Sequence, residues 1–509
     1  MATQGGGASV GGDARFVIVS NRGPVTFSRS ESGEREYSRG AGGLVTALSA
    51  VSRRRRDAVW IASAMSEEDA RVAEESLEEP YEVEGFKMVL VEHEAEAYDL
   101  MYNHLANPLL WFVQHGLYNL PYAPDLGEGT KGAWEEGYVA VNKNFAGAVA
   151  RTLEDGGGEE PVILVHDYQL YMVPLFLRER LKGKAFVSLF VHIPWPEPEG
   201  WRILPGYVRE GILRSLLAAD VVAFHTRSYA RNFVRTAREV LEIEADEEEG
   251  VVYYEGRKVW ARAYPISIDP DEFEELAQSE EVLKEEEFVK NLPGKLLLRV
   301  DRMDLSKNVV RGFTAYARML ESHPEMLGEV TFLAQLQPSR GDIPEYAGYA
   351  EAIQRAVDDV NEKHGTNSSS SSSSSTWQPV VLSMEDNFPR SVAAYKNYHA
   401  LLVNAVRDGM NLIAKEAAVV NEKNGVLILS EGAGAHEELG EHALTVNPFD
   451  VDEQAEALHE ALTMPDDERA RRAQAVKHTV EANTIEEWVE AQLEDIATYR
   501  KQHRGGANS

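Results

Sequence analysis

Two cationic side chains, Arg302 and Lys307, stand five positions apart in a chain that is acidic overall. They bracket the segment 302–307, which follows an apolar run and precedes an amphipathic one. The fork of an Arg and the point charge of a Lys, aimed at one place, suit the two phosphates of a diphosphate. Asp304 lies between them and leaves an alternative open, because it could hold Arg302 in a structural ion pair.

A second segment with anion-binding character is 407–412, followed by Lys415 and Glu416. Gly409 permits a close approach of the backbone, and the N–H groups at the start of the next helix would face an anion. Glu416 lies one helical turn further on. A carboxylate in that position can accept hydrogen bonds from both ribose hydroxyls of a nucleotide.

Three polar residues follow apolar runs in the first half of the chain: Arg22, Asp167 and His192. Asp167 could bind sugar hydroxyls or cap the next helix, and the segment alone leaves both interpretations open. Prolines fix the loop of His192 and should present it at the rim of a site, although a lone His is more often structural.

A glycine cluster at 40–44 opens an expected helix and contains Gly42 and Gly43. Glycines there would let a phosphate or a sugar approach backbone N–H groups at the helix start. Most such turns merely reverse the chain, so this feature is weak evidence by itself. Its spacing differs from the dinucleotide fingerprint, and a plain dehydrogenase is therefore not favoured.

The elements that must position these residues are short apolar runs alternating with longer amphipathic segments. The runs show little polar alternation, which is typical of strands buried on both faces of a parallel sheet. The pattern predicts an α/β protein with two Rossmann-like domains facing a cleft, with ligands beyond the carboxyl ends of the strands. The expected strands are 15–20, 58–63, 87–91, 161–166, 185–192 and 221–225, then 295–300, 330–336, 380–384, 401–406, 426–430 and 444–447.

The domain organisation that follows has four parts. We expect a disordered tail at 1–14, domains at 15–265 and 266–484, and a helix at 485–503 that packs across the domain junction. The tail is polar and Gly-rich, without the apolar core of a signal peptide. Eight serines at 368–375 are expected to form a flexible loop.

Composition excludes several classes of function. The chain has 509 residues, 43% of them hydrophobic, with a net charge of −33 and no cysteine. The charge disfavours binding to nucleic acid or anionic membranes, and the missing thiols exclude disulfides and Cys-based metal sites. No apolar run reaches the ~20 residues that span a bilayer. We therefore expect a cytoplasmic protein. Its acidic charge indicates either an ordinary solvated surface or adaptation to a salt-rich cytoplasm. A homo-oligomer is left open.

Seven segments, in order, resemble motifs of the trehalose-6-phosphate synthase family. They are Ser-Asn-Arg, Ala-Gly-Gly-Leu, His-Asp-Tyr, His-Ile-Pro-Trp-Pro, Arg-x-Asp-x-Ser-Lys, Ser-Arg-Gly-Asp and Arg-Asp-Gly-Met-Asn-Leu-x-x-Lys-Glu, and the match runs from about Arg15 to about Tyr499. The resemblance implies the two-domain fold called GT-B. It also implies transfer of glucose, with retention, from UDP- or GDP-glucose to glucose 6-phosphate, giving α,α-trehalose 6-phosphate without a metal or other cofactor.

The resemblance also implies a role for each matching residue. The first domain would bind the acceptor and the second the nucleotide-sugar. The implied acceptor residues are Arg22, Trp60, Tyr102, Trp111, Asp167 and Arg340. The implied donor residues are Gly42, Gly43, Arg302, Lys307, Gly409, Met410, Asn411, Leu412 and Glu416. The implied catalytic residues are Arg302, Lys307, His192 and Asp408.

The chain departs from the family pattern at two places. Asn308 stands where many members have Gly, and the stretch around Trp201, with Gln169, resembles the branch that includes the pseudo-glycosyltransferase making validoxylamine 7′-phosphate. The intact segment 407–412 and the intact cations favour true glucosyl transfer. Alternatives are a glucosylglycerol-phosphate synthase using glycerol 3-phosphate, a pseudo-glycosyltransferase, or a non-catalytic sugar-phosphate sensor. A glycoside hydrolase would leave the basic diphosphate site unexplained.

Overall fold

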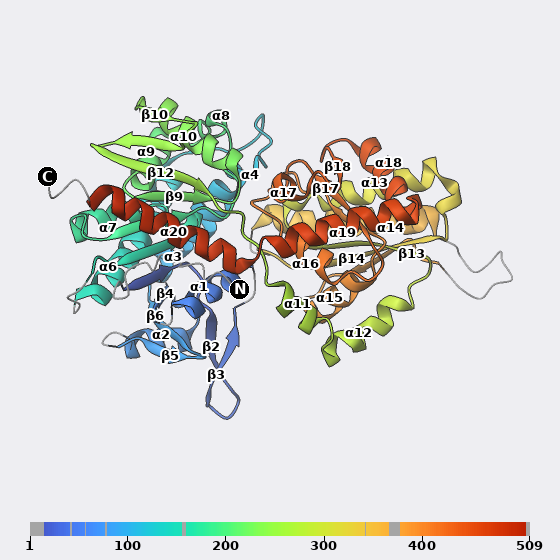
Figure 1. Ribbon diagram of the computed structural model, residues 1–509, viewed down its shortest axis with the longest axis horizontal. Helices are drawn as coiled ribbons and strands as arrows, with labels where there is room; N and C mark the ends of the chain where they lie inside the picture. The colour runs from blue at the N-terminus through green and yellow to red at the C-terminus, as the bar shows by residue number, and fades with distance from the viewer. Residues whose placement is uncertain are drawn as a thin grey trace, which may run out of the picture. The chain divides into compact units, whose positions relative to one another are not determined.

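The computed structural model describes residues 15–40, 43–55, 57–76, 79–154, 159–341, 343–365 and 377–504. The expected tail at 1–14, Gly42 and the serine run at 368–375 lie outside these residues. The chain divides into two compact units, Met1–Pro265 with Ile485–Ser509, and Ile266–Thr484 (Figure 1). Each unit contains its own sheet.

The sheet of the first unit has ten strands in the order β10-β11-β12-β9-β8-β7-β1-β4-β6-β5. The seven strands from β12 to β6 run parallel, and β5, β11 and β10 add antiparallel edges. The bounds are β1 Phe16–Val19, β4 Val59–Ser63, β5 Tyr81–Val83, β6 Phe86–Val91, β7 Val162–His166, β8 Phe186–Phe190, β9 Val221–Phe224, β10 Ala245–Asp246, β11 Val251–Tyr254 and β12 Arg257–Ala263.

The first strand lies in the middle of this sheet, and the chain then builds outward in both directions. β4 and β6 follow on one side of β1, whereas β7, β8 and β9 follow on the other. The order reverses between β1 and β7, whose residues Val19 and Val165 are in register. Ligands of open α/β sheets bind beyond the carboxyl ends of the strands at such a point. The segments of Arg22 and Asp167 begin there.

Helices connect and cover these strands. They are α1 Gly43–Arg54, α2 Glu67–Glu75, α3 Ala95–Asp99, α4 Phe112–His115, α5 Glu128–Gly132, α6 Ala140–Glu154, α7 Val173–Leu181, α8 Pro198–Trp201, α9 Gly206–Leu216 and α10 Arg227–Leu241, with a 3-10 turn η3 at Tyr168–Leu170. α10 shows the local logic: the Thr226 side chain accepts from the Tyr229 N–H at its start, and Glu242 ends it in the left-handed conformation.

The last helix, α20 (Ile485–Arg504), returns to the first unit, where Figure 1 shows it lying over the sheet. Its Tyr499 hydroxyl donates to the Lys258 carbonyl at 2.9 Å, and the Trp488 indole donates to the Tyr264 carbonyl at 3.2 Å. These buried aromatic side chains explain why the C-terminal segment belongs to this unit. Packing of the helix across the junction between the units stays a prediction.

Two features of the first unit were not expected from the sequence. A hairpin of β2 (Val25–Arg29) and β3 (Arg35–Arg39) separates the first strand from the glycine cluster. Two π-helices, η1 (Leu100–Trp111) and η2 (Ala133–Val139), replace ordinary helical turns. The helical segment from Ala133 to Glu154 therefore begins as a π-helix and becomes α-helical only at Ala140.

The second unit is built on a six-stranded parallel sheet in the order β15-β14-β13-β16-β17-β18. Counted from its own first strand this is 3-2-1-4-5-6, the order of a dinucleotide-binding sheet, and it reverses between β13 and β16. The bounds are β13 Lys295–Arg302, β14 Val330–Gln337, β15 Val380–Ser383, β16 Ala400–Val403, β17 Val426–Ser430 and β18 Leu444–Val446.

The helices of this unit bury apolar stripes against the sheet, as Phe313, Tyr316 and Leu458 do. They are α11 Pro270–Leu276, α12 Glu280–Lys290, α13 Val309–Ser322, α14 Pro344–His364, α15 Phe388–Asn397, α16 Ile413–Val420, α17 His436–Leu439, α18 Val451–Thr463 and α19 Asp466–Ala482, with 3-10 turns η4 Leu305–Lys307 and η5 Pro324–Met326. The expected α/β class with two Rossmann-like parallel sheets is confirmed.

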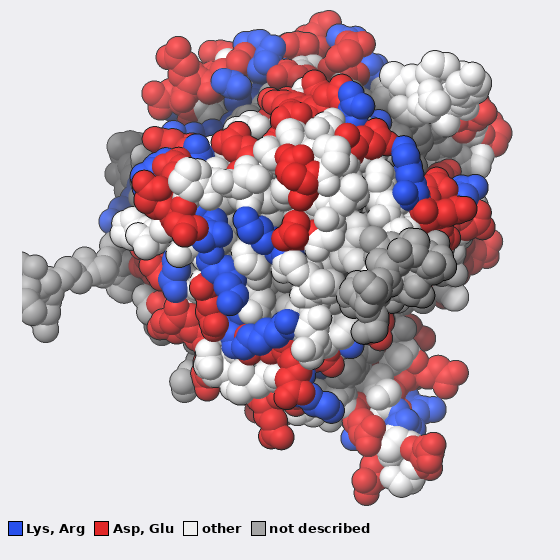
Figure 2. All heavy atoms as spheres, turned by 90° about the vertical axis from the view of Figure 1, so that its right-hand side faces the viewer, with Lys and Arg blue, Asp and Glu red and all other residues white. Residues whose placement is uncertain are grey.

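Acidic and basic side chains are interspersed on the face drawn in Figure 2, with uncharged areas between them. This distribution agrees with many short acidic runs spread along the sequence. Among the described helices, none combines the length and the apolar character needed to cross a membrane.

Candidate active site

The candidate diphosphate site begins where β13 ends, at Arg302. The chain then makes the 3-10 turn η4 before α13 starts. Asp304 holds this turn by accepting hydrogen bonds from the Ser306 N–H at 2.9 Å and the Ser306 hydroxyl at 2.7 Å. The Lys307 side chain, only 11% exposed, donates to the carboxylate of Asp408. The predicted segments 302–307 and 407–412 therefore meet between β13 and β16, where the strand order of this sheet reverses (its switch point).

Asp408 lies in the loop after β16, and the turn at 432–434, which follows β17, holds this loop by backbone hydrogen bonds. The Asp408 N–H donates to the Gly432 carbonyl at 3.0 Å, and the Gly434 N–H donates back to the Asp408 carbonyl at 3.1 Å. A Cβ atom at Gly434 would lie 2.0 Å from the Gly409 carbonyl oxygen, so only glycine fits. Sequence reasoning missed this turn, and the Gly-Ala-Gly run after an expected strand was the available signal.

A second missed residue is Arg299, which is fully buried in the middle of β13. Its Nε donates to Asp301 at 2.9 Å, and one of its terminal nitrogens donates both to Asn404 at 2.7 Å and to the Lys307 carbonyl. Burial raises the pKa of Asp301, an effect opposed by the charges of Arg299 and Lys307. Arg299 thus fixes the backbone of Lys307 from inside the sheet.

Asn308, the departure from the family pattern, has a clear structural role. Its φ is 59°, in the left-handed region, where Asn is the best substitute for Gly. Its side-chain amide donates to the Asn404 carbonyl at 2.9 Å and to the Pro448 carbonyl at 2.6 Å. The loop shape that Gly would allow is therefore retained.

Glu416 lies in the first turn of α16, beyond Asp408. Its carboxylate accepts from the Tyr395 hydroxyl at 3.4 Å. Dense packing around this carboxyl raises its pKa to about 7, and the Tyr395 hydrogen bond opposes the rise. Its neighbour Lys415 is buried and donates to Glu438 at 2.6 Å and to the Ile266 carbonyl at 2.9 Å, so Lys415 braces the fold.

Arg340, predicted for the acceptor, lies in the second unit. Its guanidinium forms an ion pair with Asp304 at 2.7 Å, and the Tyr346 hydroxyl donates to the same carboxylate at 2.9 Å. Asp304 therefore has Arg340 as an ion-pair partner, in addition to its role in the η4 turn. Arg340 has φ 45°, an unfavourable value for a side chain of this size.

Asp167 has a strained backbone at the end of β7, with φ 76° and ψ 170°. Few residues other than Gly adopt this conformation, and it costs about 1–3 kcal/mol. The interpretation of Asp167 as a helix cap is wrong, because its side chain makes no capping hydrogen bond to η3. Instead the carboxylate accepts from the His192 N–H at 3.2 Å.

Three histidines form a chain along the carboxyl ends of β7, β8 and β9. His166 Nδ1 lies 3.0 Å from His192 Nε2, and His192 Nδ1 lies 3.2 Å from His225 Nε2. Burial lowers the pKa of His166 to about 3 and that of His192 well below its ordinary value. Both rings of that pair are therefore uncharged at neutral pH. Both ring nitrogens of His192 already have histidine partners.

The predicted acceptor residues of the first unit fall into two neighbourhoods. Arg22 is exposed and lines a cavity of about 230 Å³ that also includes Arg39. The side chain of Asn21, next to Arg22, donates to the Tyr98 hydroxyl at 3.0 Å, and the Tyr98 ring stacks on Tyr102 at 5.8 Å. Arg22 and Tyr102 are thereby brought to one region.

Trp111 lies in the second neighbourhood, and the π-helix η1 sets its direction. Its ring lies 5.7 Å from that of Tyr168, the residue after Asp167. Trp111 and Tyr102 are nine positions apart, which in an α-helix of 3.6 residues per turn places them on opposite faces. At roughly 4.4 residues per turn, as i→i+5 bonding requires, nine positions make about two turns, and the two rings share a face.

Trp60 is not presented to solvent. It is 1% exposed on β4, and its indole N–H donates to the Ser20 hydroxyl at 2.8 Å. Trp201, the other departure noted in the sequence, is fully buried and packs on Trp195 at 4.3 Å. The departure at Trp201 therefore lies in the core of the first unit. Gly43 begins α1.

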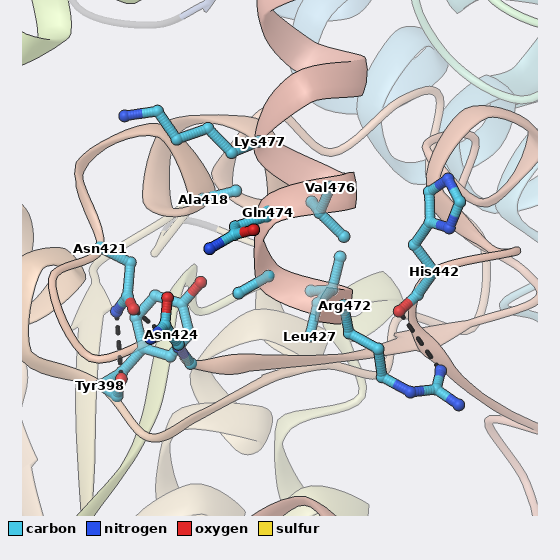
Figure 3. Close-up of a pocket in the computed structure, with 12 residues that line it drawn as sticks. Tyr398, Ala418, Asn421, Asn424, Leu427, His442, Arg472, Gln474, Val476 and Lys477 are labelled. Carbon is cyan, nitrogen blue, oxygen red and sulfur yellow. Dashed lines mark hydrogen bonds between the residues drawn. The ribbon is translucent and has the colours of Figure 1, made fainter. Parts of the chain in front are cut away.

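A further cavity lies in the second unit, at the amino end of β17 (Figure 3). It holds about 50 Å³, room for a few water molecules only. Two of its polar side chains are engaged with the protein: Asn421 donates to the Tyr398 carbonyl at 3.0 Å, and Arg472 donates to the His442 carbonyl at 3.4 Å. Because ligands bind at the carboxyl ends, this cavity is not part of the candidate site.

Comparison with known proteins agrees with these features. Residues 14–498 match the model of the family described as Glycosyltransferase family 20. The chain is 35% identical over 467 residues to alpha,alpha-trehalose-phosphate synthase [UDP-forming] 1 of Aspergillus fumigatus, covering 90% of this chain and 85% of that protein. It is 33% identical over 495 residues to the alpha,alpha-trehalose-phosphate synthase [UDP-forming] of Pichia angusta, covering 94% and 98%.

Solved structures show the same fold. The chain is similar to the structure described as trehalose-6-phosphate from E. coli bound with UDP-2-fluoro glucose, with TM-score 0.79, 26% identity and coverage of 95% and 99%. It is also similar to the UDP-forming enzyme of Burkholderia xenovorans in complex with glucose-6-phosphate, with TM-score 0.78, 28% identity and coverage of 95% and 99%. The order of the strands, the basic and acidic loops at their ends and these likenesses together show that the chain belongs to glycosyltransferase family 20.

Proposed function

We propose that this chain transfers glucose from UDP-glucose to glucose 6-phosphate, with retention, giving α,α-trehalose 6-phosphate and UDP. The observation that carries the proposal is the meeting of Lys307 and Asp408 at the switch point of the second unit. A cation there faces the place where a nucleotide diphosphate binds in sheets of this order. We choose UDP as the donor nucleotide because the relatives are named as UDP-forming synthases, and glucose 6-phosphate as the acceptor because a related structure contains it.

On the donor side, Arg302 and Lys307 hold the diphosphate. Asp408 and the backbone from Gly409 to Leu412 hold the glucose and the adjacent phosphate, and Glu416 accepts from the ribose hydroxyls. When the bond between the glucose C1 and the diphosphate oxygen breaks, its electron pair stays on the diphosphate. Fixed positive charge stabilises the negative charge that develops there.

On the acceptor side, Arg22, Tyr102, Trp111 and Arg340 bind the phosphate of glucose 6-phosphate, and Asp167 holds the sugar. The buried Trp60 supports this wall of the site through its hydrogen bond to Ser20. The acceptor hydroxyl attacks C1 on the face that the diphosphate leaves, and the departing phosphate oxygen takes its proton. This route explains retention without a carboxylate nucleophile. The carboxylate Asp167, strained into place beside His192, positions the acceptor sugar.

We place the protein in the cytoplasm, where both substrates are available, and expect its acidic surface to keep it soluble. A homo-oligomer stays a prediction, and we propose that the product serves as a precursor of an osmolyte.

The test is nucleotide release from UDP-, GDP- or ADP-glucose, each paired with glucose 6-phosphate or glycerol 3-phosphate. We expect release only with glucose 6-phosphate, and fastest with UDP-glucose. Release with glycerol 3-phosphate alone would indicate a glucosylglycerol-phosphate synthase. No release with any pair, from a folded protein that binds UDP, would indicate a non-catalytic sensor.

A further inference from the structure

A cluster of two histidines and a glutamate lies in the second unit, where the end of one helix meets the side of another. His323 follows the last turn of α13, Glu325 lies in the 3-10 turn η5, and His459 projects from α18. Their potential ligand atoms all lie within 4.8 Å of one another. The proposed transfer reaction uses none of these residues.

The distances in this cluster agree with those of a metal centre. His323 Nδ1 lies 3.4 Å from Glu325 Oε1, and His459 Nε2 lies 3.6 Å from the same oxygen. Ligands bound to zinc at about 2.0–2.1 Å in a tetrahedron stand roughly 3.3–3.4 Å from each other. The His323 edge already has this length, and the His459 edge is longer by only about 0.2 Å.

The outer contacts of His323 agree with the same interpretation. Its other ring nitrogen, Nε2, lies 3.4 Å from the carboxylate of Glu456, one turn before His459 on α18. A histidine that binds a metal through one nitrogen usually donates the N–H of the other to a carboxylate, which orients the ring and raises its basicity. Glu456 stands where such an orienting group belongs.

The two imidazole rings stack at 3.6 Å with an angle of 7° between their planes. In parallel rings the lone pairs point side by side, so the edge between the two histidines, which lies within 4.8 Å, closes on one ion only when a ring turns about its Cβ–Cγ bond. The side chains of His323 and His459 are 21% and 25% exposed, which leaves room for that rotation. Water can complete the coordination from the exposed side.

We propose that His323, Glu325 and His459 bind one divalent transition-metal ion, of the class that prefers imidazole and carboxylate ligands, with Zn²⁺ as the leading example. Such an ion fastens the end of α13 to α18. Both helices start near the candidate donor loop, because Asn308 precedes α13 and its side chain bonds to Pro448, just before α18. The site is structural and separate from the transfer chemistry.

The test uses the full chain, stripped with a chelator and titrated with Zn²⁺ alone by calorimetry. We expect one site, and a rise in Tm with Zn²⁺ that the chelator reverses. His459→Gln and Glu325→Gln should each weaken binding at least ~10-fold, and Glu456→Gln about 10-fold through the orientation of His323. His478→Gln, which changes an exposed histidine on α19, is the matched control and should bind Zn²⁺ like the wild type.

Co²⁺ supplies a spectroscopic measurement, since a low-coordinate nitrogen and oxygen site gives visible absorption bands. These bands should be lost in His459→Gln and kept in His478→Gln. Equal Zn²⁺ affinity in the wild type and the double variant His323→Gln/His459→Gln would overturn the proposal. The proposal would also be overturned if His478→Gln weakened Zn²⁺ binding as much as His459→Gln does. UDP release in His459→Gln should stay near the wild-type rate, so failure of this proposal is distinguishable from failure of the proposed function.

Discussion

The ammonium group of Lys307 donates a hydrogen bond to the carboxylate of Asp408, which lies 101 positions further along the chain. The two residues follow β13 and β16, the strands on either side of the switch point. Their side chains are 11% and 17% exposed, so the pair is held in a partly dehydrated place where charge acts strongly. Asp408 keeps the lysine oriented while Arg299 fixes its backbone.

Replacing Lys307 tests its role as a fixed charge. In Lys307→Ala we expect the rate of UDP release to fall at least ~100-fold, a loss of roughly 3 kcal/mol of transition-state stabilisation. Arg302→Ala should behave similarly. Lys423→Ala, an exposed lysine in the turn before β17, is the control and should keep its activity. A folded Lys307→Ala protein with near-normal turnover would remove this residue from the mechanism.

The carboxyl of Glu416 gives a prediction for pH dependence. Its pKa is raised from 4.5 to about 7 in the folded protein. Between these values the folded state holds a proton that the unfolded state releases, so this group lowers stability as pH rises from 4.5 through 7. The full cost is no more than about 3 kcal/mol, and less because the Glu416 residue as a whole is only half-buried.

Glu416→Gln removes that cost while keeping an acceptor for the Tyr395 hydroxyl. Urea unfolding should find the variant close to the wild type at a pH of about 5 and more stable at a pH of about 8. The wild-type KM for UDP-glucose should fall as pH rises through about 7, because the ionised carboxylate accepts the ribose hydroxyls more strongly. A constant difference in stability across this range would mean that the pKa is not raised.

The backbone of Asp167 allows strain to be measured separately from side-chain chemistry. Asp167→Gly and Asp167→Ala both remove the carboxylate and should lose turnover alike. Only glycine relieves the strain at φ 76°, so the free energy of unfolding of Asp167→Gly should exceed that of Asp167→Ala by about 1–2 kcal/mol. Equal stabilities would show that this backbone is relaxed.

Gly137 tests the positioning of the π-helix η1. A Cβ at Gly137 would lie 2.6 Å from Leu100 Cβ and 2.7 Å from the Met101 nitrogen, so Gly137→Ala must displace the start of η1 and Tyr102 with it. We expect kcat/KM for glucose 6-phosphate to fall about 10- to 100-fold, with little change in the KM for UDP-glucose. Equal effects on both substrates would argue against a specific acceptor role.

Gly348→Ala is the matched control for Gly137→Ala. Gly348 lies exposed within α14, where an added Cβ would meet no atom within 4 Å. This variant should keep full activity and gain up to about 1 kcal/mol of stability from the higher helix propensity of Ala.

The strands and the donor loops were predictable because their signals are local. Apolar runs without alternation predicted the parallel strands, and strand-to-helix turns bearing Arg302, Lys307 and Asp408 indicated the ends where ligands bind. The order of the strands then places those turns side by side. Family motifs added residue roles that composition and periodicity alone do not contain.

The remaining features depend on contacts between distant segments. Arg299 reads as an interruption of an apolar strand, and its partners at 307 and 404 become neighbours only in the folded sheet. The shared face of Tyr102 and Trp111 requires π-helical geometry, whereas periodicity arguments assume an α-helix. The histidine chain arises because β7, β8 and β9 are adjacent, which the sequence order suggests but does not prove.

The central claim is retaining transfer of glucose to glucose 6-phosphate, and the product tests it most directly. The protein is incubated with UDP-glucose carrying ¹³C at the glucose C1 and with unlabelled glucose 6-phosphate, and NMR follows the labelled carbon. The proposal predicts a labelled anomeric carbon in the α configuration, bonded through oxygen to the anomeric carbon of an α-glucose 6-phosphate unit. A β-linked product, a product joined through any other atom, or label released only as free glucose would contradict it.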